Sequence, residues 1–316
     1  MKFSVIIPCY NAELWIVGAL ESVIHQTLPP YEVLVIDDGS NDRSLDLIKA
    51  FPKQSFPIVL LQSDRQGPAA ARNAGITVAK GDWIAFLDAD DWWQPNHLER
   101  ICAAVETSGD VVYLAAAEHF SIAANRVVSR SDSPFRTLQQ AIDCETYFWL
   151  YQKHKLLELS SAAVSRQRLN EIGGFRKEFQ GAEDFEFIMR AVCDRTLSYD
   201  PVPSSYRCGN PESYSRKFAL NPDCLTASFR SLLSLQDCYT MPDIFLNGRA
   251  KTVASKSMFF QDFSTRQKVL DLAWPYLSKS QQIIFAIAPY FPNFYRLLNA
   301  FRNKIRGPQY SPRQVV

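Results

Sequence analysis

The chain of 316 residues lacks the features that mark several large classes of protein. Its seven cysteines are scattered and odd in number, and no two stand in a CxxC pair. This argues against a disulfide scaffold or a structural zinc site and fits a reducing compartment. Basic residues outnumber acidic ones by only one, so the net charge gives no reason to expect a nucleic-acid partner. The four histidines show no metal-ligand spacing.

Long hydrophobic runs are absent as well. No uncharged apolar run approaches the ~18 residues of a membrane-spanning helix, and Met1–Ile7 is too short to be a secretory signal. We therefore expect a cytoplasmic protein. Six basic residues and no acidic ones lie in 272–316, and the composition of 280–306 suits peripheral contact with the anionic cytoplasmic face of a membrane. A terminal helix pair with solvated basic residues would give the same pattern.

The sequence does contain a regular alternation of strand and helix patterns over its first 110 residues. Short apolar runs separated by helical patterns are typical of βαβ units and predict an α/β fold with a mostly parallel sheet. The expected strands are 3–8, 32–36, 58–61 and 83–87, and the expected helices are 12–25, 44–51 and 68–79.

The pattern becomes less regular after residue 110. We expect strands at 111–115 and 160–164, a helix at 183–193, and a largely helical chain beyond residue 217. One domain at 1–216, with halves 1–110 and 111–216, would then be followed by a helical C-terminal region at 217–316.

Three carboxylates follow the predicted strand 83–87 directly: Asp88, Asp90 and Asp91. Ligands bind beyond the carboxyl ends of strands in open α/β sheets, and clustered carboxylates there are costly without a cation. Oxygen ligands at this spacing suit Mg²⁺ or Mn²⁺ bound together with a diphosphate. The alternative is an acidic turn in which Asp91 begins the next helix, with Pro95 in its first turn.

Two other predicted strands end in polar residues, at 8–11 and 37–40, and should open on the same edge of the sheet. Each has a plain alternative, because Asn11 could cap a helix and 37–40 is a good turn sequence. A further acidic pair, Glu183-Asp184, follows the Gly-Gly-Phe sequence at 173–175. Acidic residues also favour the first turn of a helix, so this pair too has a structural alternative.

Four motifs taken together resemble those of the family 2 glycosyltransferases with the GT-A fold. They are Val-Ile-Ile-Pro-Cys-Tyr-Asn-Ala-Glu at 5–13, Val-Ile-Asp-Asp-Gly-Ser at 35–40, Gly-Pro-Ala-Ala-Ala-Arg-Asn-Ala-Gly at 67–75 and Leu-Asp-Ala-Asp-Asp at 87–91. Their order and spacing match over about residues 3–95, and more loosely to about 215. The resemblance implies a sugar-nucleotide donor, a divalent metal (Mg²⁺ or Mn²⁺) and transfer with inversion at the anomeric carbon.

The resemblance also implies roles for individual residues, with 1–110 as the nucleotide-binding half and 111–216 as the acceptor half. The nucleotide-binding positions are Pro8, Tyr10, Asn11 and Glu13 in the first motif, Asp38 near the base, Arg72 near the nucleotide, and Asp88 on the ribose side. Asp90 would bind the metal that bridges the diphosphate, with Asp91 supporting it. Arg72 could instead pair with a nearby carboxylate.

A sugar hydroxyl is a poor nucleophile, so a positioned base must take its proton. The resemblance assigns this role to Asp184, with Glu183 as its acidic neighbour. One departure concerns the metal, because Tyr206-Arg207 is followed by Cys208-Gly209-Asn210 and not by the histidine common in the family. Cys208, Asn210 or water could take its place, and a loop around 206–215 could close over the donor.

We expect transfer of one sugar, with a UDP-sugar favoured as donor, to a hydroxyl of a glycan or lipid-linked acceptor. The alternatives are a degenerate protein that binds a sugar nucleotide or glycan without turnover, and a processive polysaccharide synthase. The Gln-x-x-Arg-Trp motif of processive synthases is absent, which favours single transfer. An aspartyl-phosphate phosphotransferase and a sugar-1-phosphate nucleotidyltransferase fit the first strand end less well. The sequence does not predict the oligomeric state.

Overall fold

The computed structural model describes residues 1–121, 126–130, 139–143, 146–147, 159–179, 181, 183–208, 222–234, 243–257 and 263–287. The chain divides into two compact units, Met1–Phe245 and Leu246–Val316. The predicted domain boundary between residues 216 and 217 lies outside the described residues and stays a prediction.

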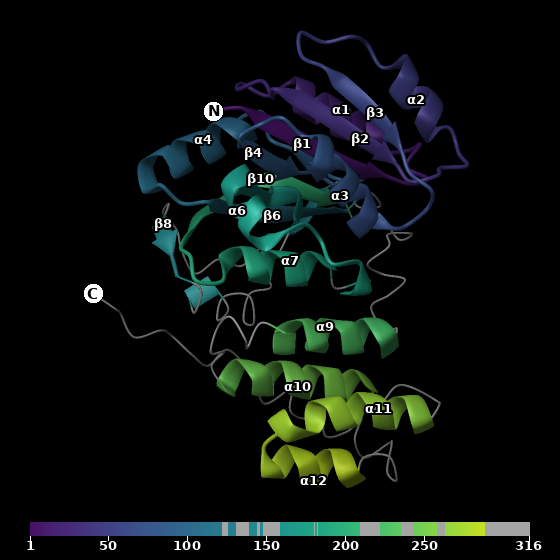
Figure 1. The fold of residues 1–316 in the computed structure, drawn as a ribbon, viewed down its shortest axis with the longest axis vertical. Helices are drawn as coiled ribbons and strands as arrows, with labels where there is room; N and C mark the ends of the chain where they lie inside the picture. Colours follow the sequence, from purple (N-terminus) through teal and green to yellow (C-terminus); the bar gives the residue numbers. More distant parts are fainter. Residues whose placement is uncertain are drawn as a thin grey trace. The chain divides into compact units, whose positions relative to one another are not determined.

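The first unit is built on one mixed sheet, whose described strands have the order β3-β2-β1-β4-β9-β6-β10-β5, with β7 on β6 and β8 on β10 (Figure 1). The strands are β1 (Phe3–Cys9), β2 (Glu32–Asp37), β3 (Ile58–Gln62), β4 (Trp83–Phe86), β5 (Trp92–Trp93), β6 (Val112–Ser121), β7 (Arg126–Arg130), β8 (Gln139–Ile142), β9 (Ala162–Ser165) and β10 (Leu197–Cys208).

Strand directions divide this sheet into two parts. β3, β2, β1 and β4 all run parallel, and so do β6 and β10. β9 runs antiparallel to both of its neighbours, β4 and β6, and thereby joins the two predicted halves in one continuous sheet. The predicted α/β class with a mostly parallel central sheet is confirmed.

The first unit has helices on both faces of this sheet. They are α1 (Ile16–Ile24), α2 (Ser44–Ala50), α3 (Pro68–Val78), α4 (His97–Ser108), α6 (Arg166–Ile172) and α7 (Glu183–Val192), with short 3₁₀ turns η1 (Leu159–Ser161) and η2 (Lys177–Phe179). A further helix of this unit, α9 (Pro222–Ser234), packs against α7 and η2. α1 shows why they pack, because its buried residues fall on one stripe of the helix: Ile16, Ala19, Leu20 and Val23.

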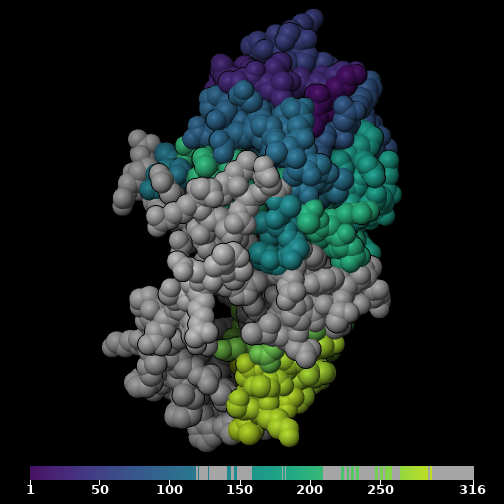
Figure 2. All heavy atoms as spheres, turned by 90° about the vertical axis from the view of Figure 1, so that its left-hand side faces the viewer, coloured from purple at the N-terminus to yellow at the C-terminus, as the bar shows by residue number. Residues whose placement is uncertain are grey.

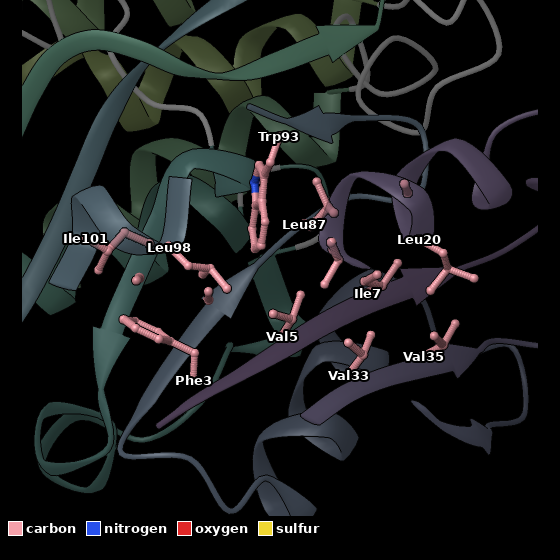
Figure 3. Close-up of a cluster of buried hydrophobic side chains, with 14 of the residues drawn as sticks. Phe3, Val5, Ile7, Leu20, Val33, Val35, Leu87, Trp93, Leu98 and Ile101 are labelled. Atoms are coloured by element: carbon pink, nitrogen blue, oxygen red, sulfur yellow. The ribbon is translucent and has the colours of Figure 1, made fainter. Parts of the chain in front are cut away.

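One face of the sheet packs against α1, α2 and α4 (Figure 3). Alternate residues of a strand point to the same face, and the labelled side chains of this cluster show that alternation: Phe3, Val5, Ile7, Val33 and Val35 from the strands, with Leu20, Leu98 and Ile101 from the helices. In Figure 2 the blue surface that includes α4 adjoins the teal and green surface of later segments, in agreement with the packing of α4 against β6 and β10.

The opposite face carries α3 and α7. A Cβ on Gly75 would lie 2.9 Å from Ile6 and from Ile36, so only glycine lets α3 pack this closely on β1 and β2. Phe187 of α7 makes an edge contact with Phe86 of β4, with ring centroids 5.5 Å apart. This packing brings the start of α7 towards the end of β4.

Most of the predicted elements of the first half are confirmed, with two corrections. The helix predicted at 12–25 begins only at Ile16. Asp91 does not begin a helix, since Trp92–Trp93 form β5, antiparallel to β10, and α4 begins at His97. The sequence also gave no indication of the long strand β10.

The described residues beyond 217 are largely helical, as predicted. They form α9 in the first unit, α10 (Asp243–Ser257) across the division, and α11 (Phe263–Ala273), η3 (Trp274–Tyr276) and α12 (Lys279–Ile287) in the second unit. None of the described helices combines the length and the apolar character needed to cross a membrane. The predicted membrane-contacting segment 280–306 lies mostly outside the described residues, beyond the end of α12, and stays a prediction.

Candidate active site

Three of the predicted site segments follow strands that end at the same edge of the sheet. In the parallel ladders Cys9 pairs with Asp37, and Ile6 pairs with Phe86. The residues that follow β1, β2 and β4 therefore converge, as the sequence predicted.

Asp38, directly after β2, organises the loop that leads into α3. Its carboxylate accepts hydrogen bonds from the backbone N–H groups of Gln66 (3.0 Å) and Gly67 (2.7 Å), and from the hydroxyl of Ser63. Gly67 has φ +89°, a conformation that favours glycine, so this residue serves the backbone conformation of the loop. Both oxygens of the buried Asp38 shape this loop, and its contact with a nucleotide base stays a prediction.

The loop after β1 presents an open aromatic surface at the same edge. Tyr10 is 40% exposed, and the guanidinium of Arg65 lies 5.0 Å from its ring centroid. Asn11 and Glu13 accept hydrogen bonds, at 2.9 and 3.0 Å, from backbone N–H groups of the loop after β2. Asn11 does not cap α1, which begins further along the chain. Pro8 is half-buried within β1.

Asp88, Asp90 and Asp91 form one compact acidic group. Each offers a carboxylate oxygen, and these three oxygens lie within 4.8 Å of one another. Asp88 and Asp90 are half-buried. Asp91 is buried, and its two oxygens accept hydrogen bonds from the Ser160 hydroxyl (2.5 Å) and from the Cys208 backbone N–H (2.9 Å). Asp91 is thus fixed by groups on two distant segments.

This acidic group has the chemistry of a divalent cation site. Burial, and then the negative charges of Asp88 and Asp90, raise the pKa of Asp91 well above its usual range. Bound Mg²⁺ or Mn²⁺ would relieve this repulsion, and both ions favour carboxylate oxygens. In the described part of the chain the group does not include the Cys208 thiol. Burial raises the pKa of that thiol to about 11, so it stays protonated at neutral pH.

Glu183 and Asp184 begin α7, as predicted, and Asp184 has the properties of a proton acceptor. Its side chain is 31% exposed. Burial raises the pKa of Asp184 to about 7, a shift that Arg72 opposes and that Glu183 and Asp88 increase. Burial also raises the pKa of Glu183, which is 4% exposed. A carboxylate that titrates near neutral pH suits general base catalysis.

Arg72 of α3 connects the acidic group to α7. Its Nη2 lies 2.7 Å from Asp88 Oδ1, and its Nη1 lies 2.6 Å from Asp184 Oδ1. The arginine is only 3% exposed, and its guanidinium lies 5.3 Å from the ring centroid of Phe175. The alternative that Arg72 pairs with a nearby carboxylate is therefore confirmed, whereas its contact with the nucleotide stays a prediction.

The turn at 173–175 is bonded both to α3 and to α7. Asn73 exchanges two hydrogen bonds with the backbone of Phe175, at 2.7 and 2.8 Å. A Cβ on Gly174 would lie 2.2 Å from Asn73 Oδ1, so this contact requires glycine. The fully buried Glu186 pairs with Arg190, four residues further along α7, at 2.6 Å, and Arg190 also donates to the Gly174 carbonyl at 2.8 Å.

Sequence reasoning missed Ser160, and no local pattern marks it. It lies in η1, just before β9, and is 69 residues from the Asp91 that it contacts. Cys208 enters the site through its backbone N–H rather than as a ligand. Asn210, and most of the loop predicted to close over the donor, lie outside the described residues.

Comparisons with known proteins agree with this geometry. The sequence model named Glycosyl transferase family 2 matches residues 4–167, more than half of the chain. An uncharacterized glycosyltransferase of Haemophilus influenzae is 27% identical over 212 residues, which are 67% of each chain. A poly(ribitol-phosphate) beta-glucosyltransferase of Bacillus spizizenii is 41% identical over 96 residues, but these cover only 29% of this chain and 15% of that protein.

Among solved structures, the fold is similar to Staphylococcus aureus TarS 1–349 in complex with UDP-GlcNAc. The TM-score is 0.73 at 19% identity, and the alignment covers 100% of this chain and 95% of that one. The sheet, with its carboxylates gathered at one edge, is that of a GT-A glycosyltransferase. The chain belongs to glycosyl transferase family 2 and is a transferase enzyme.

Proposed function

We propose that this chain is a metal-assisted, inverting glycosyltransferase that moves one sugar from a UDP-sugar to a hydroxyl of a glycan or lipid-linked acceptor. One observation carries the proposal: a single guanidinium, that of Arg72, spans the gap between Asp88 and Asp184. A candidate metal–diphosphate site and a candidate base therefore face the same small space. Inversion needs this arrangement, because the base must act opposite the leaving group.

The donor side uses the edge formed by β1, β2 and β4. Tyr10 is exposed and offers a ring face to the nucleotide base. Asn11, Glu13 and Asp38 hold the surrounding loops by hydrogen bonds, and Pro8 belongs to the same site. Asp90 would hold Mg²⁺ or Mn²⁺, with Asp91 supporting it, and Asp88 of the same acidic group would face the ribose side. The metal, when bound, supplies positive charge to the departing diphosphate. The UDP-GlcNAc complex of TarS supports a UDP-sugar as the donor class.

The acceptor side uses Asp184. One of its oxygens is held by Arg72, and the partly exposed carboxylate takes the proton of the acceptor hydroxyl as that oxygen attacks the anomeric carbon. Glu183 is buried beside it and acts electrostatically to raise the pKa of Asp184. The poly(ribitol-phosphate) in the name of one relative is a hydroxyl-bearing polymer, which supports an acceptor of this general kind.

Nucleotide release from a panel of UDP-, GDP- and dTDP-sugars, with Mn²⁺ or Mg²⁺ and with candidate acceptors, tests the proposal. We expect metal-dependent turnover of a UDP-sugar that is lost in Asp90→Ala and in Asp184→Asn. Asp46→Asn, a change at an exposed carboxylate of α2, should retain the wild-type rate. If no donor binds in the presence of metal, the proposal is wrong.

The same assay separates the alternative functions. Tight donor binding without turnover, with every acceptor supplied, would favour a degenerate binding protein. Mass analysis of the product should show one added sugar. A ladder of added sugars would instead favour a processive synthase.

A further inference from the structure

Arg72 holds an unusual position for a residue expected to bind nucleotide. Its side chain is buried, and its two terminal nitrogens are both engaged by carboxylates on different elements, Asp88 after β4 and Asp184 on α7. Its guanidinium carbon lies over the ring of Phe175, 5.3 Å from the centroid. With 3% of the residue exposed, little of it remains accessible to a diphosphate.

The charges around Arg72 explain why it is buried. Asp88, Glu183 and Asp184 all act electrostatically on its guanidinium. Without the Arg72 guanidinium, several carboxylates would lie close together in a half-buried space, and burial would favour their neutral forms. A guanidinium is planar and permanently charged, so it can hold two carboxylates in fixed directions at once, whereas an ammonium group is a point charge.

The residue next to Arg72 in α3 is held by hydrogen bonds as well. Asn73, the next residue of α3, exchanges two hydrogen bonds with the backbone of Phe175 in the turn that precedes α7. The same turn accepts a hydrogen bond from Arg190 of α7 at 2.8 Å. α3 and α7 are therefore joined through this turn as well as by the Arg72–Asp184 pair, and that pair sets the direction of the Asp184 carboxylate.

We infer that Arg72 is a positioning residue that orients the base Asp184 and couples it to Asp88 on the donor side. This inference rests on the function proposed above. It differs from the role that family resemblance implies, because Arg72 then acts on the rate through Asp184 and contributes little to nucleotide affinity.

A double-mutant cycle with Arg72→Lys and Asp184→Asn, measured in the full-length chain, tests this inference. Arg72→Lys keeps the charge but cannot hold both carboxylates by a planar fork, so we expect kcat to fall about 30-fold. The Kd for UDP with Mn²⁺, measured by calorimetry, should change less than about threefold if Arg72 does not bind nucleotide. Asp184→Asn should lower kcat about 1000-fold, and adding Arg72→Lys to it should cost less than about threefold more.

The matched control is Arg168→Lys. Arg168 is also a buried arginine, 8% exposed, but it donates to backbone carbonyls of α7 and its C-terminal end, away from the acidic group. Its replacement should lower the unfolding temperature and leave kcat within about threefold of the wild type. Such a result would separate positioning of the base from general loss of a buried arginine.

The outcomes are distinct. Three results would overturn the inference alone. The first is an unchanged kcat in Arg72→Lys, and the second is a UDP affinity that falls in parallel with kcat. The third is a double variant in which the kcat losses of the two single variants multiply. A wild-type protein that binds no donor would overturn the proposed function, and this inference with it.

Discussion

The pH dependence of turnover is the most direct prediction from the site. Burial raises the pKa of Asp184 to about 7, so this proposed base would lose its proton-accepting form as the pH falls through that value. The ionised fraction is then about nine tenths at pH 8, about half at pH 7 and about one tenth at pH 6. An aspartate with an ordinary pKa of about 3.9 would stay almost fully ionised over this range.

We therefore expect kcat/KM for the acceptor, which at saturating donor reports the donor-bound enzyme before the acceptor binds, to fall about tenfold between pH 8 and pH 6. The assay is the initial rate of nucleotide release at saturating donor and metal, constant ionic strength and limiting acceptor. Circular dichroism at each pH verifies that the protein stays folded. His97→Gln should keep the same acidic limb, because burial lowers the pKa of His97 to about 3. A flat profile from pH 5.5 to 8, or a limb that disappears with His97→Gln, would refute the assignment.

Three further predictions concern the supports of the site. Ser160→Ala removes a hydrogen bond to the buried Asp91 carboxylate. It should lower the free energy of unfolding by about 2 kcal/mol, measured by chemical unfolding, and the affinity for Mn²⁺ by about tenfold. An unchanged Mn²⁺ affinity would show that Asp91 does not need this support. Gly174→Ala would place a Cβ 2.2 Å from an amide oxygen of α3 and should destabilise by about 2 kcal/mol, whereas Gly18→Ala, whose Cβ meets nothing within 4 Å, should not destabilise; calorimetry compares the two. His97 is neutral in the fold and takes up a proton only on unfolding. Its contribution to the free energy of unfolding is therefore present above pH 6.5 and should fall by about 2 kcal/mol between pH 7 and pH 5. Urea unfolding should show a smaller loss of stability over this pH range for His97→Gln.

The parallel half of the fold could be predicted from the sequence because its signals are local. Each strand from β1 to β4 is a short apolar run, and each is followed by polar residues or a helical pattern. The βαβ rule then places their carboxyl ends at one edge, so the sequence alone predicts that the acidic group lies beside the loops after β1 and β2.

The rest of the site depends on contacts between distant segments. β5 is only two residues long, and it exists because Trp92 and Trp93 pair with Tyr206 and Ser205 of β10. Without that partner the sequence left open the alternative of a helix start at Asp91. The partners of Arg72 lie 16 and 112 residues away, so its chemistry also followed from packing rather than from pattern.

The antiparallel strand β9 has a mechanical consequence for the enzyme. Because it is hydrogen-bonded to β4 on one side and to β6 on the other, the described strands form an unbroken sheet from the half that holds Asp90 to the half that holds Asp184. We therefore expect this unit to capture its substrates without domain closure about a cleft. Any rearrangement on donor binding must occur in loops and side chains at the sheet edge, so the strands should superimpose closely between the free and the donor-bound protein.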